Sequence, residues 1–158
     1  KKPMRSKEIN LDEIKNIIPH REPFLFIDKL EDINELDKAT GVKKFSKEEN
    51  FFKGHFPGQP VVPGVILMET MAQTAAALIA YSIRKETFNK IVYLMNIEST
   101  KFRKPVFPDD TVFAKVRALR SKGRVWRFEG ITYDCNEFKV CEAKWSAMIR
   151  DRDGEQNS

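Results

Sequence analysis

The longest apolar stretch of the chain runs from Val61 to Ala80. Its apolar residues fall on nearly every side of a helix, so we predict a helix over residues 65–84 that the rest of the fold encloses. The stretch approaches the length of a bilayer span. Because it contains the carboxylate of Glu69, and carboxylates inside membranes are rare, we expect a buried core helix and no membrane partner.

After this helix the hydrophobic period changes to two residues, which is typical of strands with one buried face. The clearest case is the run in which Cys141, Ala143 and Trp145 alternate with polar residues. Strands are predicted at Phe24–Leu30, Lys38–Phe45, Ile91–Ile97, Lys101–Lys104, Thr111–Arg120, Val125–Tyr133 and Lys139–Ile149. Further predictions are a short helix from Leu11 to Ile18, a helical turn at Glu48–Phe52 and hairpin turns at Ser121–Gly123 and Asp134–Glu137.

One enclosed helix and several long strands fit together as an α+β fold, an antiparallel sheet curved around a long central helix. The sheet would leave an edge strand exposed, and pairing of two edges in a dimer would cover it. The length of 158 residues predicts one domain over residues 1–158, with residues 1–8 and 151–158 as polar, frayed tails.

The composition narrows the choice of partners. A net charge of +5 favours an acidic partner, although a solvated basic surface is the simpler interpretation. Scattered basic residues without an aromatic–basic motif argue against nucleic acid. Cys135 and Cys141 are not expected to pair, because a hairpin near Asn136 would place Cys141 opposite Ile131. Reduced cysteines indicate the cytoplasm, and the histidines and cysteines offer no zinc spacing.

Candidate chemistry concentrates in residues 54–73, GHFPGQPVVPGVILMETMAQ. Pro63 and Gly64 immediately precede the predicted helix, whose first amides lack internal acceptors and lie at the positive end of the helix dipole. The N–H groups of Gly64 and Val65 could therefore bind a carbonyl oxygen that becomes an enolate. Glycine and proline also cluster in ordinary loops, so the alternative is a loop without a catalytic role.

Two titratable residues flank this helix start. Glu69 lies among apolar neighbours, where burial favours the protonated acid, and Gln73 one turn later could orient it. The alternative is a carboxylate that reaches solvent at the helix edge. His55 is the candidate general base, unless it only hydrogen-bonds its own loop. We expect His20 to be structural, because no carboxylate or helix start adjoins it in sequence.

These groups would serve proton abstraction alpha to a carbonyl, with loss of a beta leaving group. The segment that carries them resembles the signature of the beta-hydroxyacyl-acyl carrier protein dehydratases of type II fatty acid synthesis, the FabZ type. PHREPFLFID at residues 19–28 and KFRKPVFPDD at residues 101–110 are similar to further motifs of that family. The resemblance runs from about Leu11 to Ile149 and implies the hotdog fold.

The resemblance also implies an activity. Such a hydro-lyase removes water from (R)-3-hydroxyacyl-acyl carrier protein to give the trans-2-enoyl thioester, without a metal or other cofactor. It implies that His55 takes the C2 proton, that Glu69 acts on the departing hydroxyl, and that Gly64 supplies the oxyanion amide with Val65 adjacent. In the family the two catalytic side chains come from different subunits of a homodimer, and the dimers often assemble as trimers.

The partner implied by the resemblance is an acidic acyl carrier protein that presents its substrate on a phosphopantetheine arm. The candidate docking residues are Lys101, Arg103 and Lys104, with Arg120, Lys122 and Arg124 as further candidates. An apolar tunnel should hold the acyl chain, and its candidate liners, which could equally be plain core, are Phe24, Phe26, Tyr93 and Phe102.

Two competing hypotheses remain at this stage. Another hotdog enzyme, such as an acyl thioesterase, would use a carboxylate with water and would need no histidine base. A non-enzymatic acyl-binding module would give no reason to bury Glu69.

Overall fold

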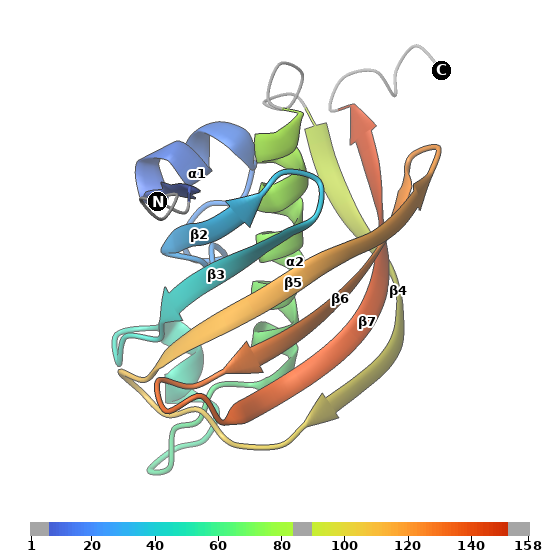
Figure 1. The fold of residues 1–158 in the computed structure, drawn as a ribbon. Helices are drawn as coiled ribbons and strands as arrows, with labels where there is room; N and C mark the ends of the chain where they lie inside the picture. Colours follow the sequence, from blue (N-terminus) through green and yellow to red (C-terminus); the bar gives the residue numbers. More distant parts are fainter. Residues whose placement is uncertain (1–6, 84–89, 152–158) are drawn as a thin grey trace, which may run out of the picture.

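The computed structural model of the chain describes residues 7–83 and 90–151. Within these residues, a seven-stranded antiparallel sheet with the order β1-β2-β3-β5-β6-β7-β4 curves around the long helix α2, Gly64–Ser82 (Figure 1). The expected α+β hotdog architecture is confirmed. The strands are β1 Lys7–Ile9, β2 Lys29–Asn34, β3 Lys38–Lys44, β4 Lys90–Phe102, β5 Thr111–Lys122, β6 Val125–Tyr133 and β7 Lys139–Asp151. The other helices are α1, Leu11–Ile17, and the 3-10 helix η1, Asn50–Lys53.

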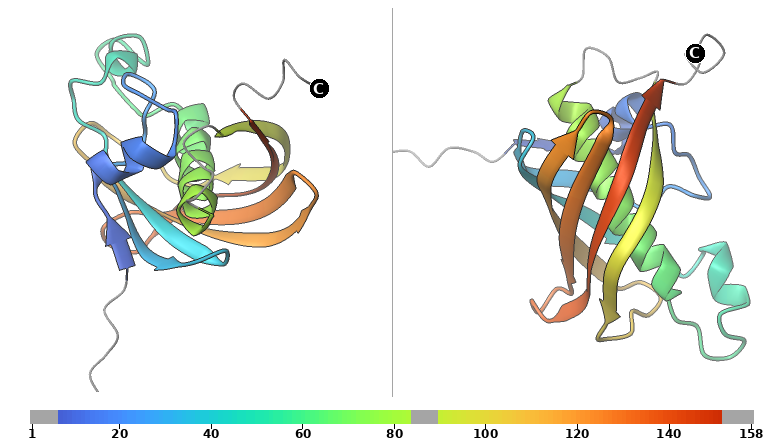
Figure 2. Two further views of the ribbon diagram at one scale, coloured as in Figure 1. Left: turned by 90° about the horizontal axis from the view of Figure 1, so that it is seen from above. Right: turned by 90° about the vertical axis from the view of Figure 1, so that its right-hand side faces the viewer.

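Helix α2 is the core element predicted from the apolar stretch. The sheet curves around it, and α1 lies on the side that the sheet leaves open (Figure 2). By length and composition α2 could cross a membrane, but 67% of its apolar window is buried inside the fold. This burial is what a core helix requires, since its side chains are apolar on most sides.

Helix α2 and strand β3 approach so closely that one position must be glycine. A Cβ atom at Gly41 would lie 2.0 Å from Thr74 Oγ1 and 3.0 Å from Thr74 Cβ. The Thr74 hydroxyl is itself fixed, because it donates to the Thr70 carbonyl at 2.8 Å. The backbone of β3 can therefore lie against α2 only because Gly41 has no side chain.

The N-terminal region departs from the expected elements. Residues 24–28 were expected to begin a strand, but β2 starts only at Lys29. The cause is a side chain: the amide of Phe26 donates to Gln73 Oε1 on α2 at 2.7 Å, so this segment packs on the helix instead of joining a ladder. Lys7 and Glu8, expected in a frayed tail, form β1 and pair with β2. Residues 1–6 and 152–158 lie outside the described residues, whereas Asp151 ends β7.

The C-terminal strands differ from the sequence predictions in three details. The predicted strands 91–97 and 101–104 are one strand, β4, whose pairing with β7 shifts register between Leu94 and Asn96 and again between Ile97 and Ser99. Such shifts interrupt the alternation that the sequence prediction used. The expected turn at 121–123 is shorter, because Lys122 still pairs with Val125. Cys141 lies opposite Thr132 rather than Ile131, since the register shifts beside Tyr133.

The contact at Gly41 generates a stability prediction. Gly41→Ala should lower the free energy of unfolding by roughly 1–3 kcal/mol, because the added methyl group overpacks a fixed helix position. Denaturant unfolding followed by circular dichroism measures the change. Gly54→Ala is the matched control, since a Cβ atom there would meet nothing within 4 Å. Equal stability of the two variants would contradict the close approach of β3 to α2.

Candidate active site

The start of α2 presents amides without internal acceptors. Pro63 is the N-cap residue, and its carbonyl accepts from Ile66 and Leu67. Among the described residues, no acceptor is recorded for the N–H groups of Gly64 or Val65. These two donors at the positive end of a 19-residue helix are a candidate oxyanion site.

Strand β4 closes one side of this helix start. A Cβ atom at Gly64 would lie 3.0 Å from two ring carbons of Phe102, the last residue of β4. Glycine at this position therefore lets an aromatic ring lie against the first turn of α2. The contact brings the end of β4, and the charged residues that follow it, next to the oxyanion site.

His55 lies in the loop that leads from η1 to α2. Its backbone is fixed on both sides, because its amide donates to the Phe51 carbonyl at 3.1 Å and its carbonyl accepts from Val61 at 2.9 Å. Its ring stacks on Phe56, with ring centroids 4.0 Å apart. Nδ1 lies 2.9 Å from the Val61 carbonyl oxygen. A carbonyl can only accept, so Nδ1 carries a hydrogen, and in the neutral ring Nε2 is then the nitrogen with the lone pair.

Glu69 is held by Gln73, as the helical spacing predicted. Gln73 Nε2 donates to Glu69 Oε2 at 2.8 Å and also approaches the Phe24 carbonyl at 3.0 Å. Gln73 Oε1 accepts from the Phe26 amide, which can only donate, so the orientation of the Gln73 amide is fixed. Burial raises the pKa of Glu69, although the Gln73 hydrogen bond partly opposes this. The environment of Glu69 therefore favours its protonated form over a wider pH range than for an exposed glutamate.

The fold also brings His20 to this carboxyl group. His20 Nε2 lies 3.8 Å from Glu69 Oε2, and the two side chains are 19% and 21% exposed. His20 was expected to be structural because no carboxylate adjoins it in sequence, and that reasoning missed a carboxylate that is close only in space. No local pattern in the sequence reveals this neighbour.

Among the described residues, neither a hydrogen bond nor an ion pair joins His55 and Glu69. His55 lies in the loop before α2 and Glu69 lies on α2, and each is held by its own partners.

The candidate docking residues are largely paired. Arg103 donates to both carboxylate oxygens of Glu142 at 3.2 Å, and Lys104 contacts Asp134. Lys101 is exposed. Arg120, Lys122 and Arg124 do not join this group. They surround the β5–β6 turn, whose neighbour on β7 is Met148, whereas Arg103 follows the strand end that pairs with Cys141.

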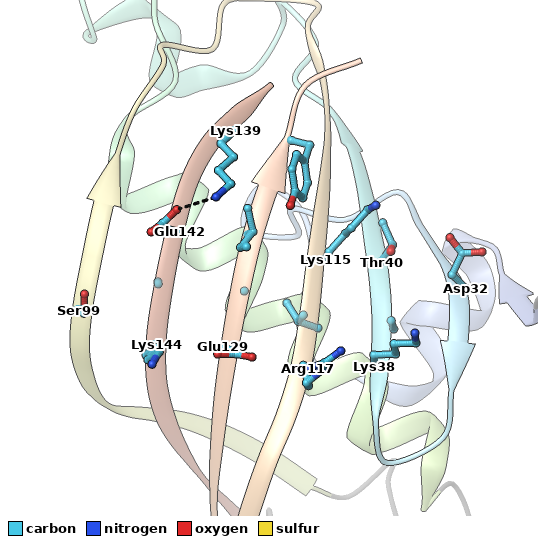
Figure 3. A pocket seen from close by; sticks show the side chains of 16 residues that line it. Asp32, Lys38, Thr40, Ser99, Lys115, Arg117, Glu129, Lys139, Glu142 and Lys144 are labelled. Atoms are coloured by element: carbon cyan, nitrogen blue, oxygen red, sulfur yellow. Dashed lines mark ion pairs between the residues drawn. The ribbon is translucent and has the colours of Figure 1, made fainter. Parts of the chain in front are cut away.

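A hollow of about 770 Å³ lies on the outer face of the sheet, away from α2 (Figure 3). Charged side chains of both signs line it, among them Lys115, Arg117, Glu129 and Lys144. Neither His55 nor Glu69 belongs to this lining, and its charges suit water better than an acyl chain. Among the expected tunnel liners, Phe26 is fully buried core, whereas Phe24, Tyr93 and Phe102 are exposed.

Comparison with known proteins decides the family. A model of the FabA-like domain matches residues 18–144. The chain belongs to the FabA-like family. Among curated members, the 3-hydroxyacyl-[acyl-carrier-protein] dehydratase FabZ of Rhodospirillum rubrum is 43% identical over 92% of this chain and 90% of its own length. The same enzyme of Gluconobacter oxydans is 45% identical over 90% of this chain and 84% of its own length. The resemblance to FabZ-type dehydratases is thereby confirmed.

Two solved structures show the same fold at low sequence identity. The dehydratase heterocomplex ApeI:P from Xenorhabdus doucetiae aligns with a TM-score of 0.77 and 12% identity, over 91% of this chain and 95% of that chain. A hypothetical thioesterase with coenzyme A from Streptococcus pneumoniae TIGR4 aligns with a TM-score of 0.55 and 11% identity, over 74% of this chain and 84% of that chain. At such low identities, both alignments support the fold alone.

The buried acid predicts a pH-dependent cost in stability. A raised pKa means that the folded state binds the Glu69 proton more tightly, so wild-type stability falls as the pH rises from the ordinary carboxyl range through the raised value. Glu69→Gln keeps the hydrogen-bonding shape without the charge. The free energy of unfolding of the variant should equal that of wild type at acidic pH and exceed it at pH values above the raised pKa of Glu69.

Unfolding in denaturant at a series of pH values measures this difference. Glu48→Gln removes an exposed carboxylate and serves as the control, which should follow wild type at every pH. A Glu69→Gln variant that is no more stable than wild type at alkaline pH would contradict the buried neutral acid.

Proposed function

We propose that the chain is a hydro-lyase that dehydrates (R)-3-hydroxyacyl-acyl carrier protein to trans-2-enoyl-acyl carrier protein in type II fatty acid synthesis. One observation carries the proposal: a carboxyl group with a raised pKa, clamped by Gln73, stands on the helix whose first amides are free. Curated dehydratases that share about two fifths of the sequence over most of the chain support the same reaction.

The residues divide the reaction between them. His55 Nε2 removes the C2 proton, while the amides of Gly64 and Val65 stabilise the negative charge that develops on the thioester oxygen. The electrons of the C2–H bond form the C2–C3 double bond, and the C3–O bond breaks. Glu69 supplies its proton to the departing hydroxyl, which leaves as water. Burial raises the pKa of Glu69, which favours the protonated form that this step requires.

We infer that the base and the acid of each site come from two subunits of a homodimer. Strand β4 is an edge of the sheet, and four apolar side chains on it are between 42% and 50% exposed: Tyr93, Leu94, Met95 and Ile97. A long apolar edge strand needs cover, and pairing with the same edge of a second copy supplies it. The further assembly of three dimers is proposed on the family resemblance alone.

The proposal places the enzyme in a reducing cytoplasm, with a carrier-bound acyl chain as substrate. Cys135 and Cys141 are both free. Burial raises the pKa of the Cys141 thiol to about 11, so this thiol stays protonated and inert.

Mixed dimers test both the catalytic roles and the subunit arrangement. His55→Ala and Glu69→Gln should each lower kcat/KM for crotonyl-thioester hydration about 10²- to 10⁴-fold, because each removes a proton-transfer group. A refolded equimolar mixture of the two variants should regain about a quarter of wild-type activity, since half of the dimers then contain one intact cross-subunit site.

Absorbance of the enoyl thioester follows the reaction, and each variant refolded alone is the control. A mixture as inactive as the separate variants would contradict the cross-subunit site. Full activity of His55→Ala, or retained thioester cleavage without hydration, would contradict the dehydratase and favour a thioesterase.

A carrier-docking patch beside the end of β4 is a separate proposal. Its support is the position of the patch. Phe102 packs on Gly64 at the start of α2, and Arg103 and Lys104 directly follow Phe102 in the chain. Replacing both cations with glutamine removes their ion pairs with Glu142 and Asp134 and makes the patch less basic by two charges. The double variant should raise KM for an acidic carrier-bound substrate by up to about tenfold, as two exposed charge contacts are lost.

The kinetics of a small thioester such as crotonyl-pantetheine should stay unchanged in the double variant. Lys122→Gln, at the opposite end of the sheet, is the matched control and should change neither substrate's KM. Equal losses on both substrates would show that the two residues act on the site and not on docking.

A further inference from the structure

His20 is a buried titratable side chain that the reaction described above does not use. It follows α1, whose C-terminal end Arg21 covers by donating to the carbonyls of Ile18 at 2.9 Å and Lys15 at 2.6 Å. Arg21 also donates to the His20 carbonyl at 2.7 Å. The backbone at His20 is thus fixed between α1 and the segment that Gln73 holds on α2.

The His20 ring faces one particular oxygen of Glu69. Nε2 lies 3.8 Å from Oε2, the same oxygen that accepts from Gln73. Nδ1 of His20 is buried, and no hydrogen-bond partner is recorded for it among the described residues. Two nitrogen-bearing side chains therefore converge on Oε2 and leave Oε1 to carry the proton toward the substrate.

We propose that His20 is a positioning residue for Glu69, whose imidazole Nε2–H fixes Oε2 and stabilises the carboxylate that forms as the proton leaves Oε1. This inference rests on the dehydratase function proposed above. The distance of 3.8 Å exceeds a hydrogen bond, but active-site hydrogen bonds commonly shorten when substrate binds. An interaction that strengthens as Glu69 becomes anionic lowers the barrier rather than only binding substrate.

The protonation state of His20 suits this role. Burial, and then the positive charge of Arg21, lower the pKa of His20, so the ring is neutral near neutral pH. With the hydrogen on Nε2, the atom left unpaired at Nδ1 is an acceptor, which is less costly to bury unpaired than an N–H donor. Among the described residues, Arg21 is the charged side chain recorded against His20, and uncharged Gln73 is the other recorded partner of Glu69.

Replacement of His20 in the full-length enzyme tests the proposal. His20→Leu should lower kcat for crotonyl-thioester hydration about 10- to 100-fold, because the acid loses one of its two holding groups. It should also move the alkaline limb of the kcat profile to higher pH, since the carboxylate loses a stabilising donor and gains an apolar neighbour. His20→Gln, whose amide N–H reaches the position of Nε2, should restore much of kcat and the wild-type limb.

The decisive measurement is the same substitution in the Glu69→Gln background. There His20→Leu should cost less than about twofold, because the group on which it acts is absent. A full 10- to 100-fold further loss, or an unchanged pH limb in the single variant, would overturn the proposal. If His20→Leu does not fold, His20→Asn, which shortens the reach of the donor, takes its place with the same expected results. Failure of the dehydratase function itself gives a different result. In that case wild type would not hydrate the crotonyl thioester, or Glu69→Gln would not lower its activity.

Discussion

The side chain of Gln73 is the contact on which the arrangement of the site depends. Its amide oxygen accepts from Phe26, and its amide nitrogen serves both the Phe24 carbonyl and Glu69 Oε2. One buried group therefore attaches the segment after α1 to the central helix and orients the acid on that helix. Loss of this amide would leave the buried Phe26 N–H without a partner, which costs about 1–3 kcal/mol.

The same contact explains why several expectations from sequence were correct and others were wrong. The extent of α2 could be predicted to within two residues, because its apolar pattern and the preceding Pro63–Gly64 pair are local signals. Glu69 and Gln73 could be paired from helical spacing alone. The expected start of the first strand at Phe24 was wrong, because the Phe26 amide binds a side chain 47 residues away, and no local period reveals such a partner.

The proximity of His20 to Glu69 was missed for a similar reason. Sequence reasoning asked which charged groups adjoin His20 along the chain, whereas the neighbour that matters is Glu69, which the Gln73 contact brings to it. The register shifts in β4 were likewise invisible, because bulges remove the alternation by which strands are recognised. Features set by local spacing were predictable, and features set by a single long-range polar contact were not.

The proposed division of the site rests on where the two side chains lie. Glu69 stands on α2, held by Gln73, and the first turn of the same helix contacts Phe102 at the end of β4. His55 lies in a separate loop and is fixed by its own backbone contacts. In the proposed dimer, pairing of the β4 edges would cover the exposed apolar strand and complete each site. One surface would then serve stability and catalysis, so a change along β4 would act on both.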